Sequence, residues 1–215
     1  VLLNAISEPI IHDTYSNSEG CHFSLLTSSK ISASSKSLLF SKINTISKSF
    51  IEHLICSDVL FITFGSSWGY TDIKQNLISA NCHKMPQKMF LKKLSSIDLM
   101  YQVWGNVIEK LNDLNSNLKI VFTISPVRHS KDGLIENNRS KARLIELVNK
   151  LTESYNVSYF PSYEIIIDQL RDYRFFKPDR VHPNKEAISF VWNRFMKCFM
   201  SSQTIDIAQQ IKNIK

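Results

Sequence analysis

The sequence predicts an α/β fold in which a parallel sheet is covered by helices on both faces. Three short apolar runs, at 58–64, 119–125 and 157–160, are typical of strands that are buried on both sides. Segments with apolar residues at helical spacing separate these runs and follow the last of them. Such alternation of helix and strand indicates parallel strands that are joined by helical crossovers.

The first third of the chain is expected to run from an irregular segment into a helix and a strand. Residues 1–36 show no regular pattern and are expected to form a serine-rich loop. The helix that follows is marked by apolar residues at helical spacing, namely Ile43, Ile46, Phe50 and Leu54. The strand at 58–64 comes next, and a long polar and aromatic loop is expected over 65–94.

Three further helices follow from the spacing of apolar residues. The first begins after a cap at Ser95 or Ser96 and carries a wide apolar stripe over 97–111. The other two are expected at 144–151 and 188–199. Each of these helices lies beside a predicted strand, as a covered parallel sheet requires.

The length of 215 residues suits one domain, which we expect over 1–200 with a helical extension over 201–215. Lys and Arg exceed Asp and Glu by 26 to 19, a net charge of +7. The basic residues do not gather on one predicted helix face and no nucleic-acid-binding motif is present, so we expect no nucleic-acid partner. No apolar run reaches transmembrane length, so we expect no membrane partner either.

Cysteine usage indicates a reducing compartment. None of the four cysteines forms a CxxC pair, the pattern of zinc ribbons and redox motifs; they are Cys21, Cys56, Cys82 and Cys198. Scattered cysteines in a chain of this size are usually free and mostly buried thiols. Together with the lack of a leader peptide, this predicts a cytoplasmic protein.

Polar and aromatic residues collect where the predicted strands end. The three segments that follow the strands are FGSSWGY (64–70), SPVRHSKDG (125–133) and PSYEI (161–165). Ligands of parallel α/β sheets bind beyond the carboxyl ends of the strands. The loop DRVHPN (179–184), which precedes the last strong helix, is expected to open onto the same rim.

This loop contains an acid–base pair at short spacing. His182 has a side chain suited to general-base work near neutral pH, provided that a partner on Nδ1 fixes its tautomer. Asp179, three residues earlier, can reach that nitrogen across a tight turn. The alternative is structural, with Asp179 accepting from loop amides and His182 lying at the start of a helix. Pro183 and Asn184 suit such a helix start in either case.

Other polar residues near the rim have two interpretations. Arg128 and His129 follow a strand, where an arginine either binds a carboxylate or phosphate or only pairs with the rim. Cys82 and His83 with His129 are conceivable metal ligands, but their spacing is not that of a tetrahedral site, so we expect no metal. Five residues before the loop are expected to brace it by ion pairs, namely Tyr163, Glu164, Arg171, Asp172 and Arg174.

Longer segments resemble a known family. D-x-x-H-P before a final helix looks like the last block of the SGNH (GDSL-type) hydrolases. The segments TFGSSWGY (63–70), NCHKMPQKMF (81–90), FTISPVRHSKDGLIENNRSKA (122–142) and YFPSYEIIIDQLRDYRFFKPDRVHP (159–183) closely resemble the GSCFA-domain family, a branch of that superfamily. VLLNAISEPI (1–10) resembles the segment just after the family's Gly-Ser-Cys-Phe-Ala motif. The resemblance spans nearly the whole chain.

The resemblance implies a flavodoxin-like three-layer α/β/α sandwich, the SGNH-hydrolase fold, here lacking its N-terminal strand. It also implies a serine esterase or acyl hydrolase that acts on a small-molecule or carbohydrate ester without a cofactor. Asp179 and His182 would be its acid and base. The nucleophile should be the serine of Gly-Ser-Cys-Phe-Ala, which these 215 residues do not contain, so we expect it upstream. Ser66 or Ser67 is the alternative, although neither lies on a strand-to-helix elbow.

The oxyanion-binding residues follow less directly from the resemblance. Related hydrolases carry Gly-x-Asn-Asp where this chain reads Gly65-Ser66-Ser67-Trp68, and Asn81 is a substitute donor. The predicted oxyanion-binding or substrate-binding residues are Gly65, Ser66, Asn81, His83, Arg128 and His129. The absent serine motif also leaves an alternative function, a catalytically inactive module that binds a small molecule or carbohydrate.

Overall fold

A three-stranded parallel sheet lies at the centre of the computed structural model, which describes residues 14–16 and 20–214. Its strands, in the order β4-β8-β9, are β4 (Val59–Phe64), β8 (Lys119–Ile124) and β9 (Val157–Phe160). Both pairs of neighbours are parallel. The three strands predicted from the apolar runs and their parallel arrangement are therefore confirmed.

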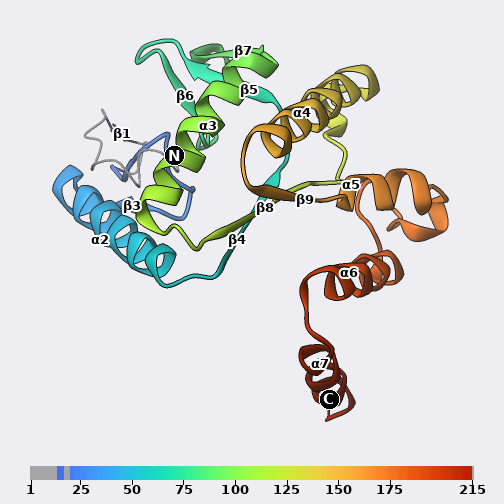
Figure 1. Ribbon diagram of the computed structural model, residues 1–215. Coiled ribbons are helices and arrows are strands. Elements are labelled where there is room, and N and C mark those ends of the chain that lie inside the picture. Colours follow the sequence, from blue (N-terminus) through green and yellow to red (C-terminus); the bar gives the residue numbers. More distant parts are fainter. Residues whose placement is uncertain (1–13, 17–19, 215) are drawn as a thin grey trace.

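Helices lie on both faces of this sheet. Alternate strand residues such as Phe64 and Phe122 join a core with α3 (Ile97–Leu114) and α4 (Leu134–Ser154). On the opposite face, the ring of Phe195 in α6 (Lys185–Phe199) lies 5.2 Å from Phe61 and 5.3 Å from Phe160. Figure 1 shows α3 and α4 on one side of the strands and α6 on the other. The cover over β4 is partial, since Phe61 is 46% exposed.

Side-chain caps fix where the helices begin. Ser35 caps α2 (Lys36–Ile55) by accepting from the Leu38 amide. Ser96, one of the two caps expected, accepts from the Leu99 amide and begins α3. Asn184 accepts from the Ala187 amide at 3.0 Å, so the DRVHPN loop ends where α6 begins. The predicted helices are therefore present and longer than their apolar stripes.

The loop expected over 65–94 is in part a second sheet. Three antiparallel strands lie there in the order β6-β5-β7, namely β5 (Trp68–Asp72), β6 (Leu77–Ser79) and β7 (Phe90–Leu94). Asn76 takes a left-handed conformation (φ +50°) in the turn between β5 and β6. The expectation was wrong because these short strands mix polar and apolar residues, and pairing rather than periodicity makes them strands.

Residues before 36 also hold short strands, against expectation. They are β1 (Tyr15–Ser16), β2 (His22–Phe23) and β3 (Ser32–Ala33), which pair antiparallel. Two-residue strands carry no periodic signal, which explains the wrong expectation. The sequence segment 1–10 and the rest of 1–13 lie outside the described residues.

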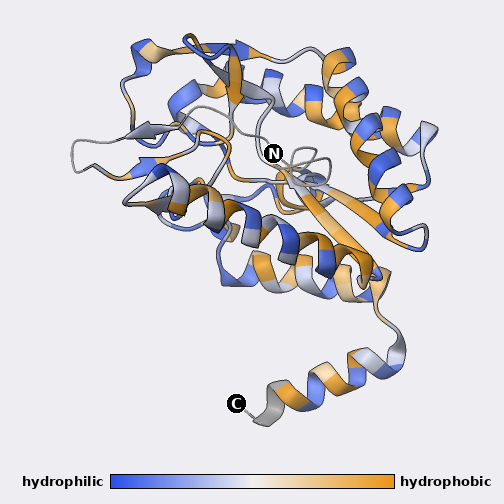
Figure 2. Ribbon diagram, turned by 90° about the vertical axis from the view of Figure 1, so that its left-hand side faces the viewer, coloured by the Kyte–Doolittle hydropathy of each residue, from blue (hydrophilic) through white to orange (hydrophobic). Residues whose placement is uncertain are grey.

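The C-terminal helix α7 (Ser202–Ile214) extends away from the rest of the chain, as Figures 1 and 2 both show. Its apolar residues Ile207 and Ile211 are exposed. The division into a domain over 1–200 and an extension stays a prediction. None of the described helices is long and apolar enough to cross a membrane. All four cysteines are free, but Cys56 and Cys198 are exposed, not buried as expected.

Candidate active site

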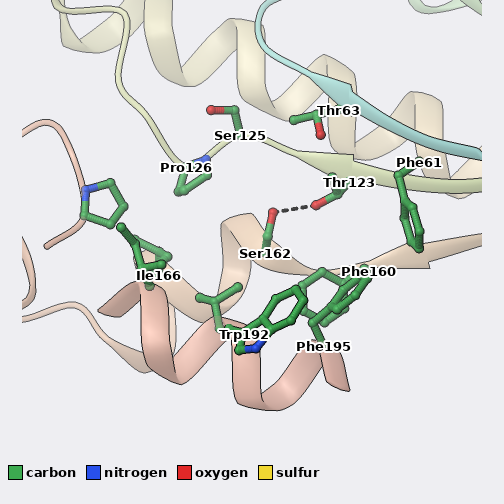
Figure 3. A pocket seen from close by; sticks show the side chains of 13 residues that line it. Phe61, Thr63, Thr123, Ser125, Pro126, Phe160, Ser162, Ile166, Trp192 and Phe195 are labelled. Atoms are coloured by element: carbon green, nitrogen blue, oxygen red, sulfur yellow. Dashed lines mark hydrogen bonds between the residues drawn. The ribbon is translucent and has the colours of Figure 1, made fainter. Parts of the chain in front are cut away.

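The segments that follow β8 and β9 meet at one rim, beside a cavity of about 420 Å³. Ser125 and Pro126 line it after β8, Ser162 lines it after β9, and Pro183 of the DRVHPN loop lines it too. The cavity then continues between the sheet and α6, where its lining is apolar, with Phe61, Phe160, Ile188, Val191, Trp192 and Phe195. Figure 3 shows Ser125 and Pro126 on one side and the rings of Phe61 and Phe160 on the other.

Asp179 and His182 are in direct contact in the loop that borders this cavity. Asp179 Oδ2 lies 2.7 Å from His182 Nδ1. The other carboxylate oxygen, Oδ1, accepts from the amides of Val181 at 2.9 Å and His182 at 3.0 Å. The aspartate thus accepts from loop amides and contacts the imidazole at the same time. The contacts expected for an acid–base pair and those expected for a structural role are therefore both present.

These hydrogen bonds set the charge of Asp179. The amides of His182 and Val181, followed by the imidazole, lower the pKa of the carboxyl group from 3.8 to about 2. The carboxylate is therefore ionised throughout the neutral range. A proton on His182 Nδ1 would be directed at this anion and would leave the lone pair on Nε2, a nitrogen that makes no hydrogen bond to any described residue. Its side chain is 52% exposed, so a substrate can reach it.

Backbone hydrogen bonds hold the loop in shape. The Lys177 amide donates to His182 O at 2.8 Å, and the Arg180 amide donates to Lys177 O at 2.8 Å. The Asn184 amide donates to Phe175 O at 2.9 Å. Arg180 adopts a left-handed conformation (φ +57°) at the tip of this turn. The Asp179–His182 contact therefore forms within a short segment whose own backbone fixes it.

The ion-pair network expected to brace the loop is absent among the described residues. Its charged members pair close by in sequence, as Arg171–Asp168 at 3.4 Å and Arg174–Asp172 at 3.9 Å. All four of these side chains are mostly exposed. Exposed pairs of this kind contribute little stability, and backbone bonds brace the loop in their place.

Arg128 supports the loop from the segment after β8. Its Nη1 donates to Arg180 O at 3.0 Å, and its guanidinium lies 5.2 Å from the ring centroid of Phe176. It makes no ion pair with any acid in the described part of the chain. Contact with a substrate stays a prediction for Arg128, beside this structural contact.

Gly65 and His129 are brought together at the end of β4. A side chain at Gly65 would place its Cβ 3.8 Å from His129 Nε2. The His129 amide in turn donates to Asn137 Oδ1 at 3.0 Å. Two of the predicted substrate-binding residues, 64 positions apart in the chain, therefore lie side by side at the rim.

The first turns of α4 hold this part of the rim through buried polar side chains. Ser140 Oγ accepts from the Ser67 amide at 2.8 Å and lies 3.1 Å from Ser66 Oγ. The Ser67 hydroxyl donates to Ser140 O at 3.1 Å, and Ser66 Oγ accepts from the Trp68 amide at 3.1 Å. Both hydroxyls thus fix the loop after β4, and neither contacts His182. This bonding disfavours them as nucleophiles.

Lys141 is the most deeply placed cation of the rim. It is 1% exposed, and its Nζ donates to Gly65 O at 2.7 Å and to Ser125 O at 2.6 Å. The ends of β4 and β8 are thereby tied to one ammonium group. Burial lowers the pKa of Lys141 from 10.5 to about 8, so the side chain is still mainly protonated at pH 7.

Sequence reasoning missed these α4 residues, although a signal was available. Asn137, Ser140 and Lys141 continue, at helical spacing, the buried stripe that holds Leu144, Leu147, Val148 and Leu151. Polar residues on the buried face of a helix require partners, since an unpaired buried polar group is costly. Because these three polar residues lie on the same buried face of the helix as the apolar stripe, they are predicted to bond to polar groups at the rim.

Asn81 and His83 lie in a different set of contacts. Asn81 Oδ1 accepts from the His83 amide at 2.7 Å. His83 Nε2 lies 3.0 Å from Thr27 O, and its ring stacks on Phe23 at 4.5 Å. These local contacts account for both side chains, and none of them joins the two residues to Gly65. Their roles as oxyanion donor and substrate contact stay predictions.

Comparison with known protein families identifies the family of this chain. The family model of the GSCFA family matches residues 1–195. The chain belongs to the GSCFA family. This confirms the resemblance found in the sequence segments. None of the curated proteins matches the chain.

In this GSCFA-family chain the predicted site residues fall into groups. Asp179 and His182 lie in the DRVHPN loop and Arg128 contacts it from the segment after β8, whereas Gly65, Ser66 and His129 meet at the start of α4. Across the described ranges, no three His, Cys, Asp or Glu side chains gather in a way that holds a metal ion. The chemistry that these contacts favour is proton transfer by the Asp179–His182 pair.

Proposed function

We propose that this GSCFA-family chain is the acid–base part of an SGNH-type serine hydrolase that cleaves esters of small molecules or carbohydrates. The 2.7 Å contact between Asp179 Oδ2 and His182 Nδ1 is the observation that carries the proposal. The mixed α/β structure with its parallel sheet is compatible with a flavodoxin-like three-layer sandwich, the fold we propose for the complete domain.

The proposed mechanism assigns a proton path to this pair. His182 Nε2 takes the proton of a serine hydroxyl while that oxygen bonds to the ester carbonyl carbon. Asp179 stabilises the imidazolium that forms, because its carboxylate stays ionised at neutral pH. His182 then returns the proton to the leaving alkoxide, and a water molecule activated by the same pair releases the acyl group.

The serine is proposed to be that of the Gly-Ser-Cys-Phe-Ala motif from which the family takes its name. These 215 residues do not contain the motif. The hydroxyls of Ser66 and Ser67 are already engaged with α4, which supports a nucleophile supplied from elsewhere in the complete protein.

The cavity beside the pair is suited to the hydrocarbon part of such an ester. Ligand pockets commonly span 300–1,000 Å³, and this cavity measures about 420 Å³. Its lining along α6 includes Val191, Trp192 and Phe195, and Pro183 next to His182 borders it. An acyl group in this cavity would have its carbonyl carbon near the rim.

The test uses the complete reading frame in which these residues stand. Sequencing upstream of the Val1 codon establishes whether Gly-Ser-Cys-Phe-Ala is present, and the complete protein is then assayed with acetyl and longer acyl esters of p-nitrophenol. His182→Ala is expected to lower kcat by about 10³-fold or more, because the general base is lost. His53→Ala, an exposed histidine of α2, is the matched control and should keep the full rate.

Two outcomes would contradict the proposal. Unchanged turnover in His182→Ala would remove the pair from the chemistry. A complete protein that binds an ester or sugar without hydrolysing it would favour the alternative, a binding module on the same fold.

A further inference from the structure

We propose that Lys141 is a positioning residue that holds the Gly65–Ser66 peptide so that the Ser66 N–H donates to the oxyanion of the reacting ester. The inference rests on the proposed hydrolase function and names a donor for it. No asparagine of the Gly-x-Asn-Asp kind is needed if the backbone supplies this group.

The first support is the hydrogen bonding of Lys141, a buried cation. Lys141 is 1% exposed, yet none of the ion pairs between described residues includes it. Burying a lysine without an acid is costly, as the lowering of its pKa to about 8 shows. Its hydrogen bonds go to two carbonyl groups, Gly65 O and Ser125 O, at the ends of neighbouring strands.

The second support is the geometry of the peptide that Lys141 binds. The described chain has no cis peptide bond, so the C=O and N–H of the Gly65–Ser66 peptide point in opposite directions. Because the Gly65 carbonyl is directed at Lys141 Nζ in the interior, the Ser66 N–H is directed away from Lys141. The other bound carbonyl, that of Ser125, belongs to a peptide bond with Pro126, which has no N–H.

The third support is a comparison of successive amides after β4. The Ser67 N–H donates to Ser140 Oγ at 2.8 Å, and the Trp68 N–H donates to Ser66 Oγ at 3.1 Å. The Ser66 N–H donates to none of the residues that the structure describes. Backbone donors are seldom left unpaired when water is excluded, so this N–H is available for a ligand.

The charge of Lys141 adds to the effect. An ammonium group bound to the Gly65 carbonyl polarises the whole peptide and strengthens its N–H as a donor. The imidazole of His129 is a neighbour of the same peptide, since a Cβ at Gly65 would lie 3.8 Å from His129 Nε2. A positive charge held behind the peptide therefore favours negative charge in front of it.

Nuclear magnetic resonance tests the positioning without any turnover. The ¹H–¹⁵N signal of Ser66 is compared in the complete protein, in Lys141→Met and in Lys150→Met. Lys150 lies on the same helix but is exposed and pairs with Asp98 at 3.1 Å. We expect Lys141→Met to shift the Ser66 amide and change its hydrogen exchange, and Lys150→Met to leave both unchanged. If Lys141→Met does not fold, Lys141→Gln, which keeps one donor, takes its place.

Kinetics of the same variants test the link to catalysis. Loss of one oxyanion donor typically lowers kcat by about 10²–10³-fold. We therefore expect about a 10²-fold lower kcat in Lys141→Met with nearly unchanged KM, and a normal rate in Lys150→Met. A folded Lys141→Met protein with a normal kcat would overturn the inference, as would an unshifted Ser66 amide. If the unmutated protein hydrolyses no ester, the proposed function fails, whereas the Ser66 amide still reports whether Lys141 sets that peptide.

Discussion

The DRVHPN loop and the first turns of α4 both border the candidate active site, but they are built in opposite ways. Asp179 and His182 are three residues apart, and their side chains are 47% and 52% exposed. Ser140 and Lys141 are 2% and 1% exposed, and their partners at the ends of the strands lie up to 76 positions away.

The difference indicates that the loop residues are suited to chemistry and that the α4 residues support the structure. An exposed pair held by its own turn is free to exchange protons with a substrate, and little stability depends on it. A buried polar group must keep its partners, because the desolvation cost remains when a partner is removed. We therefore expect substitutions in α4 to affect the free energy of unfolding and substitutions in the loop to affect turnover.

The largest effect is expected from the buried lysine under alkaline conditions. The pKa of Lys141 is about 8 in the folded chain against an ordinary 10.5, a difference that corresponds to about 3 kcal/mol. Between these pH values the unfolded state binds more protons than the native state, so the free energy of unfolding rises with pH. Lys141→Met lacks this titration.

Urea unfolding at pH 7.5 and 10.5 measures the effect. Relative to Lys141→Met, the unmutated protein should gain up to about 3 kcal/mol over this interval. The Lys150→Met control should instead follow the unmutated protein at both pH values. Parallel changes in the unmutated protein and Lys141→Met would contradict the lowered pKa and would weaken the contrast between the two regions.

A second test removes the hydroxyl of Ser140, an uncharged member of the buried polar residues of α4. Ser140→Ala leaves the Ser67 amide without its 2.8 Å acceptor in a buried position. Such a loss typically costs about 1–3 kcal/mol in the free energy of unfolding. Ser189→Ala in α6 is the control, because that hydroxyl is exposed and bonds only to Lys185 O in its own helix. Equal stability of the two variants would show that the buried polar residues of α4 do not contribute to the free energy of unfolding.

The loop is tested by Asp179→Asn, which keeps an acceptor for the loop amides but removes the charge. We expect a smaller loss of stability than in Ser140→Ala, together with loss of turnover in the complete protein. Titration of the Asp179 carboxyl carbon by nuclear magnetic resonance should give a pKa of about 2. A folded-state pKa below the ordinary 3.8 stabilises the protein above that pH, and this contribution is lost as the pH falls toward 2. A titration near 3.8 would show that the amide bonds do not form in solution.

The same contrast explains what the sequence could predict. Apolar periodicity located the three parallel strands and the main helices, because those patterns are local. The Asp179–His182 contact also followed from spacing, since the turn that forms it lies between the two residues. Strands β5, β6 and β7 were missed because they mix polar and apolar residues without a clear period and form by pairing with one another.

Long-range placement accounts for the other differences at the site. Ser66 and Ser140 are 74 positions apart, and no local pattern places them in contact. Asn81, suggested as a donor by the resemblance, accepts from the His83 N–H through its amide oxygen, and its role as an oxyanion donor stays a prediction. The buried polar stripe on α4 was the feature that periodicity alone would have revealed.

The smallest effect on stability is expected for a substitution at Gly65, which lies beside His129 at the rim. A Cβ at Gly65 would lie 3.8 Å from His129 Nε2, which is ordinary van der Waals contact, so Gly65→Ala should change the free energy of unfolding by less than about 0.5 kcal/mol. Gly105→Ala is the contrasting control, because its Cβ would lie 2.4 Å from the hydroxyl of Tyr155. Urea unfolding compares the two variants, and ester hydrolysis by the complete protein is measured beside it. A lower rate in a fully stable Gly65→Ala protein would assign Gly65 to substrate contact, whereas a loss of stability would place it with the buried set on α4.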